Sequence, residues 1–238
     1  MNAYSQKYEL TLEGPQIEEA VAKSTLSIYV PTHDIANRIG SDSLDTANRI
    51  LHYASDNEFY IGTLGTEDVD CDFIDLTYVR VNEDQIKRDV HNKIYNFKES
   101  LRQREGEKHG EIILQFFEKE RGRLLDCVKP WELWILKLTV VRLNSESEHQ
   151  MYRESVGEAL SDIIFSICRE INRPRYTPKM PKRQELPQVF DNSYSSFHPY
   201  LHKIVYDAAN PSYGIGLSSA VSSTVSTVQG LLKMSLNK

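Results

Sequence analysis

Alternating apolar and polar residues mark the first structural elements of the chain. Residues 8–12 alternate strictly, which predicts a half-buried strand that ends at Gly14-Pro15. Pro15 favours the start of a helix, and one apolar face continues to about Tyr29. The chain therefore begins with a strand followed directly by a helix.

A polar stretch and an acidic run follow this helix. Residues 31–57 are mostly polar, with a weak helical pattern at 44–53, and we interpret them as a loop insertion. Residues 59–64 and 73–81 are predicted strands, and the acidic segment between them is the expected turn.

The next segment predicts a strong helix, because Asn82 is a suitable N-cap and apolar residues recur behind it at helical spacing. Those residues are Ile86, Val90, Ile94, Phe97 and Leu101. Residues 111–118 then predict a strand, and residues 130–143 predict a long strand. One face of that long strand carries Trp134, Leu136, Leu138 and Val140.

The longest helix begins at a capping box formed by Ser145 and Glu148, and it continues to about Asn172. Its apolar residues cover so broad an arc that we expect it in the middle of the fold. Residues 173–187 are rich in proline and basic residues and predict an extended crossing segment. A last strand is expected at 199–208.

The uncharged segment 208–232 is too polar for a membrane span, so we expect a soluble chain. Its apolar residues predict a marginal C-terminal helix. These residues are Leu217, Val221, Val225, Val228 and Leu232. Together the elements predict an α+β fold, with a mostly antiparallel sheet covered on one side by three good helices.

Composition narrows the class of protein. Twenty-eight basic and 34 acidic side chains make the chain mildly acidic, which disfavours nucleic acid as a partner. Cys71, Cys127 and Cys168 are widely spaced and contain no paired motif, so we expect free thiols in a reducing cytosol. The N-terminus lacks the apolar core of a signal peptide.

Three patterns could carry chemistry, and each has a simpler interpretation. Asp68, Asp70 and Asp72 resemble the start of a calcium loop but lack its glycine and its distant glutamate, so a solvated turn is favoured over a metal site. His198 and His202 lie on a predicted strand, where four residues span about 13 Å, too far for one zinc ion.

The third pattern, Gly214-Ile-Gly216, lacks the context of a phosphate-binding loop, and we find no nucleophile motif. The sequence therefore predicts no catalytic residue, no cofactor and no enzyme activity.

Four segments closely resemble the autophagy-related protein 101 family, in order along nearly the whole chain. They are residues 12–20 (LEGPQIEEA), 62–81 (GTLGTEDVDCDFIDLTYVRV), 130–134 (PWELW) and 176–181 (YTPKMP). The resemblance implies a single HORMA domain over residues 1–238, with 31–57 as an insertion and 207–238 as a C-terminal segment.

The family is a non-enzymatic scaffold of autophagosome initiation. The resemblance implies that this chain binds and stabilises the HORMA domain of autophagy-related protein 13. Through that partner it would join the Unc-51-like kinase and its scaffold subunit at the phagophore assembly site. Two alternatives are a HORMA adaptor of checkpoint or repair type that clasps a peptide, and a metal-dependent enzyme that uses the acidic run.

Two surfaces are predicted to carry the binding. Helical spacing places Glu154, Gly157, Ser161 and Phe165 on the arc opposite Ile163, where small residues would admit a partner helix. Family members often carry an aromatic Trp-Pro-Phe finger before the PWELW motif, but residues 121–127 (RGRLLDC) contain no aromatic residue. Leu124 and Leu125 either form a shortened finger or fold back onto the domain.

Overall fold

The computed structural model describes residues 3–29, 50–53, 59–60, 66–103, 108–120, 127–171, 173, 178, 181–194 and 198–207. Side chains are described throughout these ranges except at 50–53, 59–60 and 183. The predicted finger at Leu124 and Leu125 lies outside the described residues, as do the Gly214-Ile-Gly216 pattern and the predicted C-terminal helix.

A four-stranded sheet forms the base of the fold, in the order β1-β7-β6-β9. β1 (Tyr4–Glu13) runs parallel to β7 (Cys127–Val141). β6 (Lys108–Glu120) pairs antiparallel with both β7 and β9 (His202–Asp207). The mostly antiparallel α+β architecture predicted from the sequence is confirmed.

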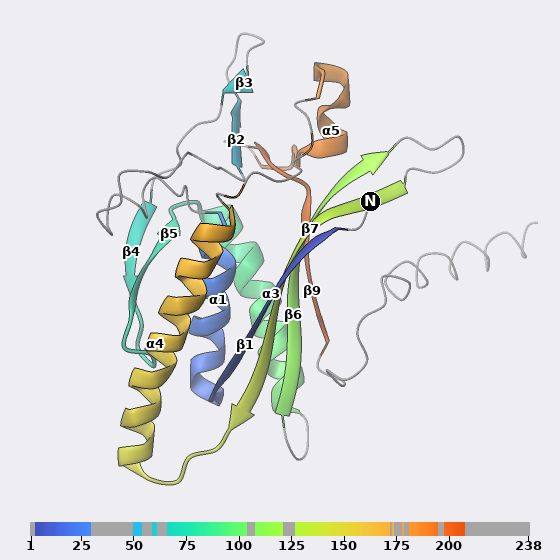
Figure 1. Ribbon diagram of the computed structural model, residues 1–238. Helices are drawn as coiled ribbons and strands as arrows, with labels where there is room; N and C mark the ends of the chain where they lie inside the picture. The colour runs from blue at the N-terminus through green and yellow to red at the C-terminus, as the bar shows by residue number, and fades with distance from the viewer. Residues whose placement is uncertain are drawn as a thin grey trace, which may run out of the picture.

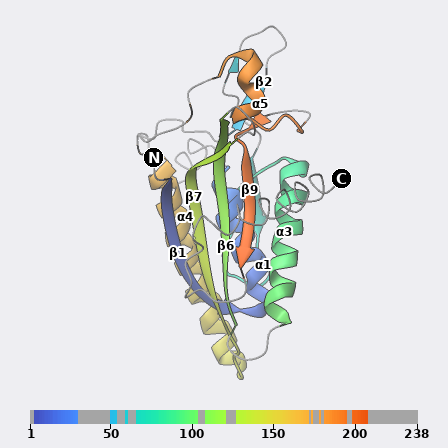
Figure 2. The same ribbon diagram turned by 90° about the vertical axis from the view of Figure 1, so that its right-hand side faces the viewer.

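Three helices cover one face of this sheet (Figures 1 and 2). They are α1 (Ile17–Ser27), which follows the 3-10 turn η1 (Gly14–Gln16), α3 (Asp84–Arg102) and α4 (Glu146–Ile171). α1 contacts both other helices and lies between them (Figure 2). The prediction that α4 is the central helix is wrong, because α1 occupies that place.

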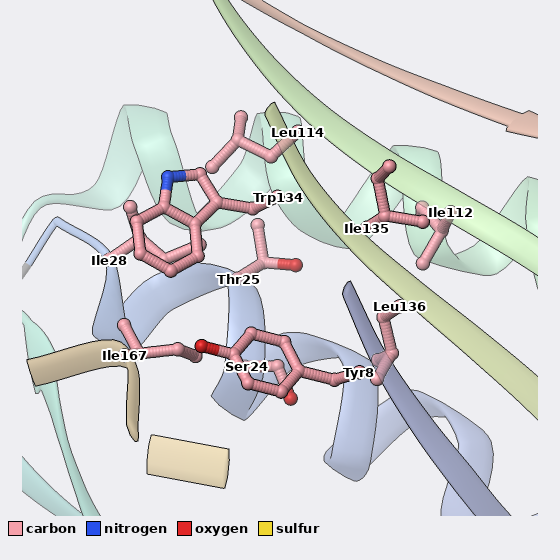
Figure 3. A pocket seen from close by; sticks show the side chains of 10 residues that line it. All are labelled: Tyr8, Ser24, Thr25, Ile28, Ile112, Leu114, Trp134, Ile135, Leu136 and Ile167. Carbon is pink, nitrogen blue, oxygen red and sulfur yellow. The ribbon is translucent and has the colours of Figure 1, made fainter. Parts of the chain in front are cut away.

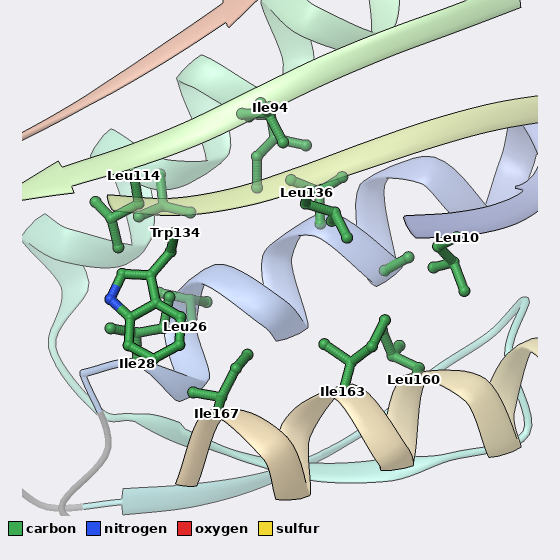
Figure 4. Close-up of a cluster of buried hydrophobic side chains, with 14 of the residues drawn as sticks. Leu10, Leu26, Ile28, Ile94, Leu114, Trp134, Leu136, Leu160, Ile163 and Ile167 are labelled. Carbon is green, nitrogen blue, oxygen red and sulfur yellow. The ribbon is translucent and has the colours of Figure 1, made fainter. Parts of the chain in front are cut away.

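The core lies between the sheet and the helices (Figure 4). Leu10, Leu114 and Leu136 extend from three strands toward Leu160 and Ile163 of α4 and toward the buried side of α1. Burial of each such side chain contributes about 1.5–3 kcal/mol. The alternating strand positions predicted to face inward are therefore the positions that hold the layers together.

Local signals explain where two of the helices begin. α4 has the predicted capping box, because Ser145 Oγ accepts from the Glu148 amide at 3.3 Å and Glu148 Oε2 accepts from the Ser145 amide at 3.1 Å. α3 begins one residue later than expected, with Glu83 rather than Asn82 as its N-cap. Its five predicted apolar residues are all buried.

The acidic run forms a strand rather than the predicted turn. β4 (Thr66–Asp70) pairs antiparallel with β5 (Thr77–Val81), and the connection between them is residues 71–76. This hairpin lies on the side of the helices away from the sheet (Figure 1). The prediction was wrong because carboxylates rarely favour strands, and here their cross-strand partners decide the structure.

Smaller elements lie beyond one end of the main sheet (Figure 1). β2 (Ile50–Tyr53) is a strand where a helical pattern was predicted, and it pairs with β3 (Phe59–Tyr60) and β8 (His198–Pro199). The predicted extended segment ends in the 3-10 turn η2 (Arg183–Glu185) and the short helix α5 (Leu186–Val189). Among the described residues, no helix is long and apolar enough to cross a membrane.

Candidate interaction surface

The outer face of α4 exposes two large apolar side chains. Met151 is 70% exposed and Phe165 is 48% exposed. At 100° per residue these two positions lie within about 40° of each other around the helix axis. Glu154 is exposed at the edge of the same face, and Ser161 is half-buried there. Three of the four predicted partner-binding residues therefore lie on or beside this face.

Gly157 does not lie on the exposed face, and this part of the prediction is wrong. It is buried, and a Cβ atom at this position would stand 2.8 Å from the backbone oxygen of Asp75. The connection between β4 and β5 passes directly over the helix at this point. The absence of a side chain at Gly157 therefore allows the hairpin to pack on α4 within the same chain.

Basic side chains from β5 and from α3 neutralise part of the acidic strand β4. Arg80 Nε donates to Glu67 Oε1 at 2.8 Å, and Lys87 Nζ lies 3.1 Å from the same oxygen. The bond from Arg80 lowers the pKa of Glu67. Thr77 Oγ1 donates to Asp70 Oδ1 at 2.6 Å. Among the described residues, no group of three or more potential ligands is close enough to hold a metal ion.

The connection between β4 and β5 is held by residues at the start of α1. The Glu19 carboxylate accepts from the backbone amide of Asp72 at 2.8 Å and from that of Phe73 at 3.0 Å. The buried Gln16 side chain donates to the Phe73 carbonyl at 3.0 Å. These bonds fix the backbone while the Phe73 ring remains 51% exposed.

Lys23 is completely buried beneath this hairpin. Its Nζ donates to the Leu76 carbonyl at 3.0 Å and lies 5.0 Å from the centroid of the Tyr78 ring. Burial lowers the pKa of Lys23. The amine therefore ties α1 to the hairpin from inside the fold, where a carbonyl and an aromatic face replace water.

A small cavity lies between the sheet, α1 and α4 (Figure 3). Tyr8, Trp134 and Ile167 line it together with other mainly apolar side chains, and its volume is about 20 Å³. This volume is close to that of one water molecule. It is too small for a substrate or cofactor.

The two predicted histidines have structural partners. His198 Nδ1 lies 3.3 Å from the Asp191 carbonyl oxygen, and His202 Nδ1 lies 3.1 Å from that of Tyr200. The His202 ring packs edgewise on Tyr29 at 5.5 Å between ring centroids. Burial lowers the pKa of His202, although Asp191 and Asp89 oppose this shift.

His202 makes the stability of the fold sensitive to acid. Its folded-state pKa lies below the ordinary value of 6.5, so its contribution is complete above pH 6.5 and is lost as the pH falls toward the folded-state pKa. We expect the free energy of unfolding, measured with urea, to fall between pH 7 and 5.5. His202→Phe should reduce this fall, whatever its effect at pH 7.

His149 provides the opposite case. The Glu13 carboxylate, 2.8 Å from Nδ1, raises the pKa of His149, so its contribution is complete below pH 6.5 and is lost as the pH rises through the folded-state pKa. His149→Gln should therefore make the fall on acidification steeper. If wild type and His202→Phe lose the same free energy of unfolding between pH 7 and 5.5, the acid sensitivity does not come from His202.

Burial also explains why the thiol of Cys168 is a poor nucleophile. Cys168 is 3% exposed, and burial raises the pKa of its thiol to about 11. A thiol with this pKa is protonated at neutral pH and is a poor nucleophile.

Comparison with known proteins identifies the family. A sequence profile described as "Autophagy-related protein 101" matches residues 58–184. A relative of that name from Xenopus tropicalis is 36% identical over 239 residues, which cover 99% of both chains. The chain belongs to the autophagy-related protein 101 family. The human autophagy-related protein 101 is 37% identical over 209 residues, covering 87% of this chain and 89% of its own. Family membership places the protein in autophagy, and the resemblance noted in its sequence motifs is confirmed.

Sequence reasoning missed the residues that hold the hairpin to α1. Gln16, Glu19 and Lys23 have the spacing of the polar face of an amphipathic helix, but most of α1 is buried and none of its residues is fully exposed. One signal was available, because Ser24, Thr25 and Ser27 give this helix little charged surface after Lys23. A helix without a charged face over its second half is typical of a buried position.

Proposed function

We propose that this member of the autophagy-related protein 101 family is a non-enzymatic HORMA-domain adaptor. It binds and stabilises the HORMA domain of autophagy-related protein 13 and, through it, contacts the Unc-51-like kinase complex at the phagophore assembly site. The observation that carries the proposal is the outer face of α4, defined here by Met151, Glu154, Ser161 and Phe165.

The composition of this outer face suits a protein partner. Met151 and Phe165 are exposed apolar side chains on a regular helix, and Glu158 and Asp162 are exposed between them. Apolar anchors with a charged rim are typical of protein interfaces, in which a few large side chains dominate the binding energy. A partner helix laid along α4 would cover both anchors together.

Buried ionisable groups also favour an adaptor over an enzyme. Lys23 is bonded to the Leu76 carbonyl, Glu132 accepts from Trp134 Nε1 at 2.6 Å, and Glu170 accepts from Tyr4 Oη at 2.9 Å. Each of these side chains is engaged within the core. They stabilise the fold, whereas a catalytic acid or base must reach a substrate.

A double substitution tests the proposal. Met151→Asp with Phe165→Asp replaces both apolar anchors of the outer face of α4 by charges. We expect co-purification with the HORMA domain of autophagy-related protein 13 to be lost, because each apolar anchor contributes about 1–3 kcal/mol to such an interface. The melting temperature should change little, since both side chains are substantially exposed.

Tyr95→Asp is the matched control. Tyr95 is 53% exposed on α3, so this substitution introduces one aspartate, as each substitution of the double variant does, at a comparable aromatic position away from α4. Binding should be retained in this variant. Retained binding in the double variant, with loss in Tyr95→Asp, would assign the partner surface to α3 instead. Recruitment through Leu124 and Leu125 stays a separate prediction.

A further inference from the structure

A groove of about 540 Å³ lies between α4 and the connection from β4 to β5. Its α4 wall comes from the first turns of the helix, and its opposite wall comes from the end of β1, from η1 and from the hairpin. We call it the acidic groove. The residues that matter to its chemistry are Phe73, Asp75, Glu146, His149, Arg153 and Glu154.

Negative charge dominates the acidic groove. Asp75, Glu146 and Glu154 are exposed, and within the described part of the chain their carboxylates make no hydrogen bond or ion pair. A fourth carboxylate, that of Glu13, is already paired with His149 at 2.8 Å. Arg153 supplies the other positive charge. Three carboxylates against one guanidinium leave the groove with unbalanced negative charge, which favours a cationic occupant and repels phosphate.

An aromatic ring is held in position beside these carboxylates. Phe73 is 51% exposed, yet its amide and its carbonyl are both fixed by the start of α1, through Glu19 and the buried Gln16. A fixed backbone lowers the entropy that the connection would lose on binding a ligand. The exposed ring can stack on a flat cation, which is the arrangement of a cation–π contact.

We propose that the acidic groove binds an arginine-bearing peptide segment of a partner protein. A guanidinium group is planar, so it stacks on Phe73 while it donates to the carboxylates, which the compact ammonium of lysine does less well. The site is separate from the proposed adaptor surface except at Glu154. The inference does not depend on which protein covers the outer face of α4.

The test uses the full 238-residue chain, labelled with ¹⁵N, and the peptide acetyl-Gly-Arg-Leu-Arg-Gly amide as the probe. We expect saturable shifts in the backbone amide signals of Phe73 and of residues 146–154. Replacing both arginines of the peptide by citrulline keeps their shape and removes their charge. Binding of that peptide should be about tenfold weaker.

Two variants locate the site. Glu146→Gln and Phe73→Ser should each weaken binding of the arginine peptide about threefold, through loss of a carboxylate and of the ring respectively. Glu158→Gln, an exposed carboxylate on the next turns of α4 outside the groove, should leave the affinity unchanged. Since Glu146→Gln keeps the shape of the side chain, it remains informative if Phe73→Ser disturbs the hairpin.

Three results would overturn the inference. They are equal binding of the arginine and citrulline peptides, unchanged affinity in Glu146→Gln, and peptide-induced shifts confined to another surface. Because the titration contains no HORMA partner, each of these results leaves the adaptor proposal standing. Conversely, normal peptide binding by the Met151→Asp, Phe165→Asp double variant would show that the two surfaces act separately.

Discussion

Replacing Gly157 by valine is expected to lower the free energy of unfolding by about 2–3 kcal/mol, since overpacking a close contact costs about 1–3 kcal/mol and a branched side chain adds atoms beyond the Cβ. The Cβ alone would stand 2.8 Å from the Asp75 oxygen, which is backbone and cannot rotate away. For a chain of this size, we expect the melting temperature to fall by about 4–12 °C.

Ser155→Val is the control for this prediction. Ser155 is exposed on the same helix, two residues from Gly157, and the two substitutions introduce the same side chain. Helix propensity is nearly unchanged by Ser→Val and is slightly improved by Gly→Val, so it cannot account for a loss of stability in Gly157→Val. The effect of Ser155→Val should stay within about 0.5 kcal/mol. Equal melting temperatures in the two variants would show that the hairpin does not pack on α4 at this point.

The contact at Gly157 also changes how a binding experiment must be designed. On helical spacing alone, Gly157→Arg would be a variant that blocks a partner helix while leaving the fold intact. Its buried position means that the arginine would first displace the hairpin. Loss of partner binding in that variant would therefore reflect the displaced hairpin and not a blocked partner surface. Substitutions at Met151 and Phe165 avoid this ambiguity because both side chains are exposed.

Sequence periodicity predicted the elements whose burial is regular. The stripe from Ile86 to Leu101 in α3 is fully buried, and the alternating face of β7 places Trp134, Leu136 and Leu138 in the core. In both cases one face meets water and the other meets the core, so the spacing of the apolar residues predicts which face is buried. The capping box at Ser145 was equally predictable, because it is a local interaction.

Elements decided by distant contacts could not be predicted in this way. β4 is a strand although Glu67, Asp68 and Asp70 disfavour one, since its ladder to β5 and the Arg80 pair stabilise it. Helical spacing placed Gly157 on an exposed face because it does not reveal that a hairpin 82 residues earlier in the chain, at Asp75, covers it. Glu154 and Phe165 are exposed, as the helical spacing predicted, and their role in partner binding stays a prediction.

The second large effect is expected at Lys23, which sequence alone would place on a solvated face. Lys23→Ala removes the donor to the Leu76 carbonyl and leaves a cavity around the lost alkyl chain. Truncating a long buried side chain to alanine costs about 2–5 kcal/mol, and loss of the hydrogen bond to the carbonyl of half-buried Leu76 adds about 1–3 kcal/mol. We expect Lys23→Ala to lower the free energy of unfolding by about 4 kcal/mol in urea titrations.

Lys23→Met separates packing from the amine. Methionine fills most of the same volume but cannot donate to Leu76 or stack a charge on Tyr78, while it removes the cost of burying an ammonium group. These terms oppose each other, so we expect a loss of only about 1–2 kcal/mol.

Lys93→Ala, at an exposed position of α3, is the control and should change the free energy of unfolding by less than about 0.5 kcal/mol. If Lys23→Ala were as mild as Lys93→Ala, Lys23 would not be packed beneath the hairpin. If Lys23→Met were as harmful as Lys23→Ala, the amine rather than the alkyl chain would hold α1 to the hairpin.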